Sequence, residues 1–178
     1  MIAATGFGLV VSPLAMIPAA NAAPDGSKLV ISEVYGGGGN SGATLKSDFI
    51  ELYNPTTSPI SLDGMSLQYR SATATTQPTI VFQLSGSVPA NGHWLVKAAD
   101  GAGGTDELPT PDQSSTISMG GTGGQVFLAD QTTPLTLSPV TGEMAGQPGV
   151  VDMVGFGSGA TSFEAAQTGT VSNTTAAS

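Results

Sequence analysis

The stretches that decide the fold class are Leu29–Tyr35 (LVISEVY), Gly36–Gly42 (GGGGNSG) and Asp48–Asn54 (DFIELYN). The first and third are rich in β-branched and aromatic residues, which favour β-strands. The glycines between them supply the backbone freedom that a turn requires. The sequence therefore predicts two strands joined by Gly36–Gly42, which we call the glycine loop.

Within the third stretch, Phe49, Glu51 and Tyr53 alternate with Ile50 and Leu52. Residues two positions apart lie on the same face of a strand. We expect the aliphatic pair to face the core.

The rest of the chain repeats short apolar runs separated by turn-forming residues, and no window keeps the i, i+3, i+4, i+7 spacing of an amphipathic helix. We expect strands at Leu29–Tyr35, Phe49–Asn54, Met65–Tyr69, Ile80–Leu84, Trp94–Ala98, Thr116–Met119, Gln125–Ala129 and Val150–Gly155. This spacing predicts an all-β sandwich or barrel. Segments 98–115 and 132–149 are expected to be long loops, and the tail 157–178 to supply no strand that closes a sheet.

Residues 1–22 have the character of a signal peptide. Ile2–Ile17 is mostly apolar and uncharged, and Ala20–Ala22 (ANA) fits a signal-peptidase site. The basic start of such a peptide is missing, because the first positive residue is Lys28, so translation begins upstream or the chain is trimmed. We predict cleavage after Ala22, export, and no membrane segment after cleavage. The alternative is a buried N-terminal strand or helix.

Charge and cysteine content exclude several classes of site. Four Lys and Arg against thirteen Asp and Glu give a formal net charge of −9, whereas phosphate binding needs clustered basic residues. We therefore predict no nucleic-acid contact. The chain has no cysteine, which excludes cysteine-ligated zinc and thiol catalysis. The predicted mature chain is long enough to bury a core without disulfides.

Gly37, Gly39 and Gly42 match the spacing of the dinucleotide-binding fingerprint. That site needs a helix directly after the glycines, because the pyrophosphate binds the free N–H groups of the helix N-terminus. A strand-like run follows here instead. We therefore interpret the three glycines as part of a hairpin loop.

The only histidine, His93, follows the turn Asn91-Gly92 and precedes an apolar run. A Ser-His-Asp relay is the alternative role, but no Gly-x-Ser-x-Gly elbow is present. One histidine without cysteine also argues against a transition-metal site. We expect a surface histidine beside a turn.

The segment Ala98–Ser115, which we call the acidic loop, holds four carboxylates: Asp100, Asp106, Glu107 and Asp112. Calcium binds carboxylate and carbonyl oxygens, so this loop is a candidate calcium site. It lacks the D-x-D/N-x-D/N-G pattern, and a solvated acidic loop is the preferred interpretation.

Glu33 and Glu51 are predicted on neighbouring strands, and paired carboxylates are the groups used for acid–base catalysis. The simpler expectation is that each binds a loop amide or pairs with Lys46 or Arg70. A carbohydrate platform would have to come from Tyr35, Tyr53, Tyr69 and Trp94, several of which are expected in the core. We predict no catalytic, cofactor-binding or metal-binding residue.

Several short motifs occur in a characteristic order: Ile31–Val34, Asp48–Asn54, Ile60–Gly64, Leu84–Gly86, Pro89–Gly92, Leu95–Val96 and Val151–Gly157. In these motifs the chain resembles the lamin tail domain family, in its secreted bacterial branch. The resemblance implies an immunoglobulin-like β-sandwich over residues 29–175, after a linker at 23–28. It also implies that the last strand of the family's fold is lacking.

The resemblance further implies function. In bacteria this domain stands N-terminal to secreted nucleases or phosphoesterases, or within other surface proteins, and has no established catalytic residues. We expect an extracellular, monomeric, non-catalytic module that binds or positions a neighbouring domain or a surface protein. One alternative is a stand-alone module that binds the cell envelope. Another is a metal-dependent nuclease or phosphoesterase activity in a missing downstream domain.

Overall fold

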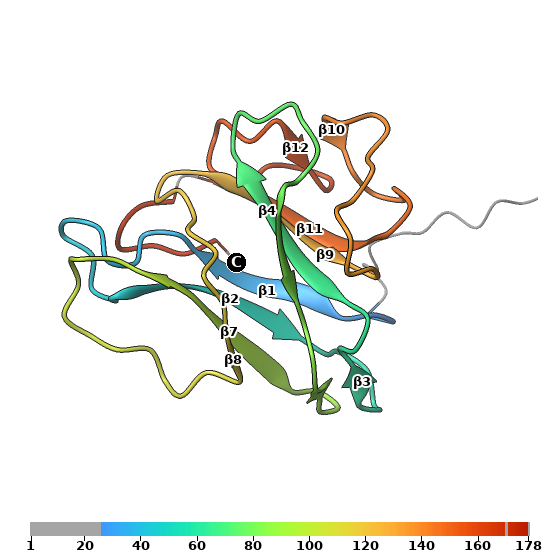
Figure 1. The fold of residues 1–178 in the computed structure, drawn as a ribbon, viewed down its shortest axis with the longest axis horizontal. Coiled ribbons are helices and arrows are strands. Elements are labelled where there is room, and N and C mark those ends of the chain that lie inside the picture. Colours follow the sequence, from blue (N-terminus) through green and yellow to red (C-terminus); the bar gives the residue numbers. More distant parts are fainter. Residues whose placement is uncertain (1–25, 170, 178) are drawn as a thin grey trace, which may run out of the picture.

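The computed structural model describes residues 26–169 and 171–177, and within them the chain forms two facing four-stranded sheets (Figure 1). Sheet 1 has the order β1 (Val30–Tyr35), β2 (Ser47–Tyr53), β7 (His93–Asp100) and β8 (Gln113–Ser114). Sheet 2 has the order β11 (Val150–Phe156), β9 (Gly124–Ala129), β4 (Ser66–Ser71) and β5 (Ile80–Gln83). Two short pairs join β3 (Ile60–Ser61) to β6 (Ser87–Val88) and β10 (Gly142–Glu143) to β12 (Ser162–Phe163). This all-β arrangement is consistent with an immunoglobulin-like sandwich.

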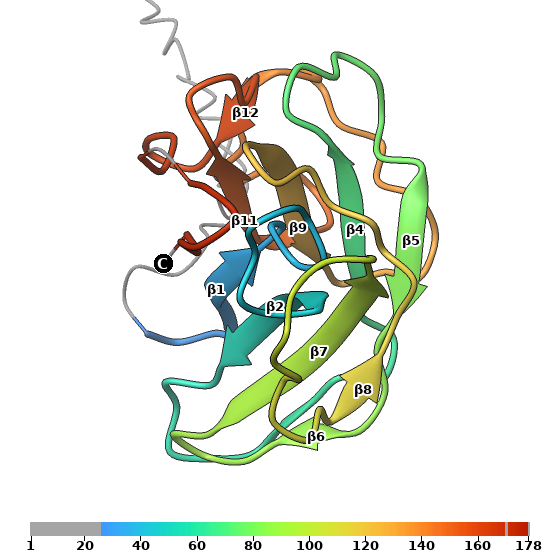
Figure 2. The same ribbon diagram turned by 90° about the vertical axis from the view of Figure 1, so that its left-hand side faces the viewer.

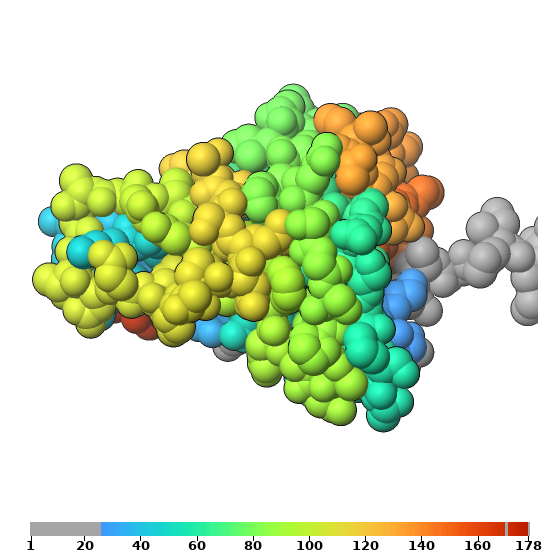
Figure 3. Space-filling model, turned by 60° about the horizontal axis from the view of Figure 1, so that its bottom comes forward, coloured from blue at the N-terminus to red at the C-terminus, as the bar shows by residue number. Residues whose placement is uncertain are grey.

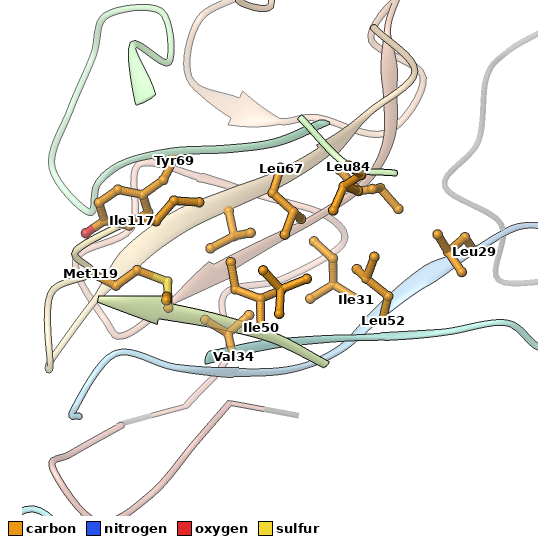
Figure 4. Packing of buried hydrophobic residues seen from close by; sticks show 14 of the residues in the cluster. Leu29, Ile31, Val34, Ile50, Leu52, Leu67, Tyr69, Leu84, Ile117 and Met119 are labelled. Carbon is orange, nitrogen blue, oxygen red and sulfur yellow. The ribbon is translucent and has the colours of Figure 1, made fainter. Parts of the chain in front are cut away.

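The core lies between the two sheets (Figure 4). Ile50 and Leu52 of β2 are fully buried there, which confirms the face predicted from alternation. Leu67 of β4 and Leu128 of β9 meet them from sheet 2. Burying each such side chain favours folding by about 1.5–3 kcal/mol, so the facing apolar rows hold the layers together.

A second apolar cluster covers the outer face of sheet 2. Residues 131–149, which we call the covering segment, bring Leu135, Leu137 and Met144 onto Phe127 of β9. All six residues of β9 are buried as a result. Residues 132–149 are largely irregular, as expected of a long loop, but they pack onto the sheet because its apolar outer face requires a cover. The cover also contains the short strand β10.

The prediction of a strand at Thr116–Met119 was wrong. The fourth strand of sheet 1 is β8, which lies slightly earlier in the chain and pairs in parallel with β7. The apolar residues Ile117 and Met119 do enter the core. The Met119 N–H, however, binds the side chain of Asp48 at 2.9 Å and not the backbone of a neighbouring strand.

The tail contributes strand pairing that the sequence did not predict. Strand β12 pairs in parallel with β10, and Ala177 forms an antiparallel bridge to Val34 of β1. In that bridge each residue donates its N–H to the other's carbonyl at 2.8 Å. The tail therefore covers part of the β1 edge.

The predicted signal peptide, residues 1–22, lies outside the described residues. No helix within residues 26–169 and 171–177 has the length and apolar character needed to span a bilayer.

Candidate functional site

The outer face of sheet 1 brings together the chemically most versatile exposed side chains. In the β1–β2 register Glu33 stands opposite Glu51, and in the β2–β7 register Tyr53 stands opposite His93. His93 Nδ1 lies 2.8 Å from Glu51 Oε1, and the Ser32 hydroxyl donates to the same oxygen at 2.8 Å. The His93 and Tyr53 rings lie 4.8 Å apart. Neighbouring strands thus assemble a carboxylate–imidazole pair beside an aromatic ring.

This pair lacks the other parts of a hydrolytic site. The side chain of His93 is 55% exposed, and its only recorded side-chain hydrogen bond within the described residues goes to Glu51. A serine nucleophile would have to bond the second ring nitrogen. Partial burial and, secondarily, the charge of Glu51 raise the pKa of Glu33. The outer face of sheet 1 therefore has side chains suited to binding, but it lacks the nucleophile that a hydrolytic site requires.

The expected partners of the two glutamates were wrong. Lys46 forms an ion pair with Glu107 at 2.6 Å. Arg70 is buried in sheet 2, where it donates to Gln125 Oε1, to the Ser162 hydroxyl and to main-chain carbonyls of the loops around it. The buried cation therefore joins the covering segment and β12 to sheet 2.

A hollow of about 310 Å³ lies at one end of this outer face, between β1, β2, the segment just before β2 and the tail. It is lined by Glu33, Tyr35, Thr44, Leu45, Phe49, Thr174 and Ala176. The Tyr35 and Phe49 rings stack at 5.6 Å, but only 4% and 9% of these residues is exposed. Because the ring faces cover one another, they leave no platform for a sugar ring. A second hollow, of about 340 Å³, is lined partly by Leu29, Ile60 and Met65.

The glycine loop connects β1 and β2, which confirms the hairpin interpretation. Its glycines allow close packing against the acidic loop, at one end of the molecule (Figure 3). A Cβ added to Gly38 would lie 1.9 Å from the carbonyl carbon of Ser47. Gly39 has φ +66°, and a Cβ there would lie 2.1 Å from the Cα of Gly101. Packing, and not phosphate binding, explains these two glycines.

Two buried polar residues hold the loops at either end of β2. Asp48 is 3% exposed and accepts the Gly38 N–H on one oxygen and the Met119 N–H on the other, both at 2.9 Å. Burial raises the pKa of Asp48 to about 6, and the two N–H donors oppose that rise. At neutral pH the carboxylate is therefore ionised and accepts both bonds.

Asn54 has the equivalent role at the other end of β2. It is fully buried, and its Nδ2 donates to the carbonyls of Ser58, Val88 and Pro89 at 2.9, 3.1 and 3.0 Å. Sequence reasoning missed both roles. The available signal was a polar residue at each end of a buried strand, since buried polar groups are almost always hydrogen-bonded.

The four carboxylates of the acidic loop have separate protein partners. Asp100 binds Lys97 and the Ser47 hydroxyl, Asp106 accepts the Thr105 hydroxyl, Glu107 binds Lys46, and Asp112 accepts the Leu95 N–H. No group of three or more histidine, aspartate or glutamate residues in the described part of the chain is placed to hold a metal ion.

This arrangement predicts the response to calcium. Saturating calcium stabilises a protein only when it binds the folded state. We expect the melting temperature to be the same in chelator and in millimolar calcium. A calcium-dependent rise that is lost in the double variant Asp106→Asn/Glu107→Gln would instead place a calcium site in the acidic loop.

Comparison with protein families matches residues 22–158 to the family model described as Lamin Tail Domain. The matched range covers most of the chain and includes every strand of both four-stranded sheets. No curated protein matches the chain.

Proposed function

The chain belongs to the lamin tail domain family, and from this premise we propose that it is an extracellular module that binds or positions part of a larger secreted protein. Lamin tail domains are in general non-catalytic. The observation that carries the proposal is the use of Asp48. This carboxylate, inside one of the motifs that resemble the family, binds two main-chain amides and is unavailable to a substrate.

Two features of the sequence support export and attachment to more chain. Residues 1–22 have the composition of a signal peptide, and the motifs around β2 resemble the secreted bacterial branch of the family. In that branch the domain accompanies nucleases, phosphoesterases or other surface domains. The net charge of −9 favours solubility outside the cell and disfavours direct contact with nucleic acid.

The first test asks whether the domain has activity of its own. We expect the purified chain from Ala23 to Ser178 to cleave neither DNA nor a chromogenic phosphodiester in the presence of magnesium, manganese or calcium. The matched variant is His93→Ala, which removes the imidazole of the outer face. Hydrolysis by the unaltered chain that disappears in His93→Ala would refute a non-catalytic role.

The second arm measures the intact mass of the exported protein from its native source. The proposal requires a mass well above that of residues 23–178. A mass equal to that of residues 23–178 would refute the positioning role and favour a stand-alone module that binds the cell envelope.

A further inference from the structure

A β-sandwich with two open sheets has four edge strands, and here two of them are covered and a third is only two residues long. Ala177 covers β1 at Val34. The edge of β11 receives the Thr168 N–H at the Gly155 carbonyl, at 3.0 Å. Strand β8 is too short to offer a row of edge groups, and its Gln113 side chain binds Ser85. Covering of this kind is how proteins protect unpaired edges.

The fourth edge, β5, has no such cover. In Figure 2 β5 lies at the outer margin of sheet 2. Leu84, the residue after β5, donates its N–H to the Met65 carbonyl at 2.9 Å, so this pair is hydrogen-bonded. Antiparallel ladders alternate bonded and non-bonded pairs, and Val81 stands opposite Gln68 in a non-bonded pair. The N–H and carbonyl groups of Val81 and Gln83 therefore point away from β4.

These outward groups have no recorded partner within the described residues. The side chains around them are also unusual for a free edge. Residues 71–96 contain no aspartate, glutamate, lysine or arginine, although the whole chain has a net charge of −9. Ile80 at the start of β5 is 40% exposed, more than any other large hydrophobic residue of the described part. Free edges normally carry charges, prolines or bulges that prevent pairing.

We propose that β5 is a docking edge for an extended, uncharged segment of a partner polypeptide, which adds to sheet 2 as a further strand. Only a polypeptide backbone offers donors and acceptors at the alternating spacing of Val81 and Gln83. Strand β5 itself carries no charge, so it suits an uncharged segment, because no charge of the strand would be desolvated on docking. Strand β5 is thus assigned as the contact surface of the binding module, and this assignment rests on the function proposed above.

A second copy of the chain fits this edge less well. Strand β5 has four residues, so pairing it with another β5 would bury far less than the roughly 1,200 Å² that a stable dimer needs. A segment tethered to the same protein or complex needs less contact, because its effective concentration is high. The same argument predicts weak binding by a free peptide.

The experiment is a nuclear magnetic resonance titration of the chain from Ala23 to Ser178 with a capped peptide of alternating threonine and valine. We expect the amide protons of Val81 and Gln83 to exchange with solvent at least about tenfold more slowly when the peptide is bound. The amides of Ile80 and Phe82 already face β4, so their exchange should stay unchanged. The same peptide with every amide N-methylated should not bind.

The matched variants are Val81→Pro and Val81→Ala. Proline removes an outward N–H that β4 does not use, and we expect it to weaken peptide binding by about tenfold or more. Alanine keeps the N–H and should bind as the unaltered chain does. If the proline variant does not fold, the N-methylated peptide provides the same test on the unaltered protein.

Three outcomes would overturn the proposal: no protection of Val81 and Gln83, equal binding of the N-methylated peptide, or protection of these amides in a dimer without peptide. The last outcome would make a second copy the occupant. None of these three outcomes bears on the proposed binding function, which the hydrolysis assay tests separately. A failure of the docking edge can therefore be told apart from a failure of the proposed function.

Discussion

Replacing Asp48 by alanine is expected to lower the free energy of unfolding by about 2–4 kcal/mol. The carboxylate is buried and accepts the main-chain N–H groups of Gly38 and Met119 at 2.9 Å. Alanine leaves both donors without an acceptor in a region that water does not reach. Each unsatisfied buried group costs about 1–3 kcal/mol. The upper end of the sum is not reached, because alanine also removes the cost of burying a carboxylate. For a domain of this size the melting temperature should fall by about 5–12 °C.

Two further variants make this prediction specific. Asp48→Asn keeps the shape and one acceptor oxygen, so it should cost about half as much as Asp48→Ala. Asp63→Ala removes an exposed aspartate whose only recorded bond to another loop is a long one, 3.3 Å from the Gly86 N–H. That change should cost less than about 1 kcal/mol. Urea denaturation of the three variants would contradict the role of the two Asp48 hydrogen bonds if Asp48→Ala were no less stable than Asp63→Ala.

Alternation predicted β2 and its buried face because a strand has a period of two, and Ile50 and Leu52 occupy one phase of it. The same reasoning failed at Ile117 and Met119. These residues alternate and are buried, and the Ile117 carbonyl accepts the Ala99 N–H of β7 at 2.8 Å, yet Met119 does not continue that ladder. The Met119 N–H is satisfied by a carboxylate far away in the chain. Alternation of apolar residues therefore predicts which side chains are buried, but it does not predict which group the backbone binds.

The covering segment shows a second limit of prediction from local sequence pattern. Residues 132–149 have no periodicity, so the sequence offered no element there. These residues are held in place by Phe127, because its side chain points away from the main core and packs against Leu135 and Met144. The unbroken apolar run of β9 was the usable signal, because a strand buried on both faces implies a layer on each side.

The candidate site was partly predictable. Glu33 and Glu51 were placed on neighbouring strands, and the structure sets them opposite each other. The approach of His93 was not predictable, since it depends on β7 lying beside β2. Strand order is a long-range property that no short window of sequence contains.

The second large effect concerns the carboxyl pair Asp152–Glu164. Asp152 of β11 accepts the Ile31 N–H of β1 at 2.5 Å and so links the two sheets. Glu164, directly after β12, forms a hydrogen bond with Asp152. Partial burial, then this bond and the charge of Asp152, raise the pKa of Glu164 to about 8. The pKa of Asp152 is also raised, chiefly by burial. One proton is therefore shared between the two groups at neutral pH.

The direction of the pH dependence follows from that shift. The folded state holds the Glu164 proton up to about pH 8, whereas the unfolded chain releases it near the ordinary glutamate pKa of 4.5. The stabilisation is complete below the unfolded value and is lost as pH rises through the folded value. Asp48 titrates near pH 6, so measurements above that pH isolate the pair. The full shift would lower the free energy of unfolding by about 2 kcal/mol from about pH 6.5 to about pH 9. Because Glu164 is only partly buried, we expect a fall of about 1 kcal/mol.

Glu164→Gln should remove most of this pH dependence. Glutamine keeps the size of the side chain and donates to Asp152 at every pH, so the variant should match the unaltered chain near pH 6.5 and exceed its stability near pH 9. Glu107→Gln is the control, because that side chain is 68% exposed and pairs with Lys46 at the surface. It should leave the shape of the profile unchanged. If Glu164→Gln kept the full loss of stability at high pH, the shared proton would not be what links β12 to the edge of the sandwich.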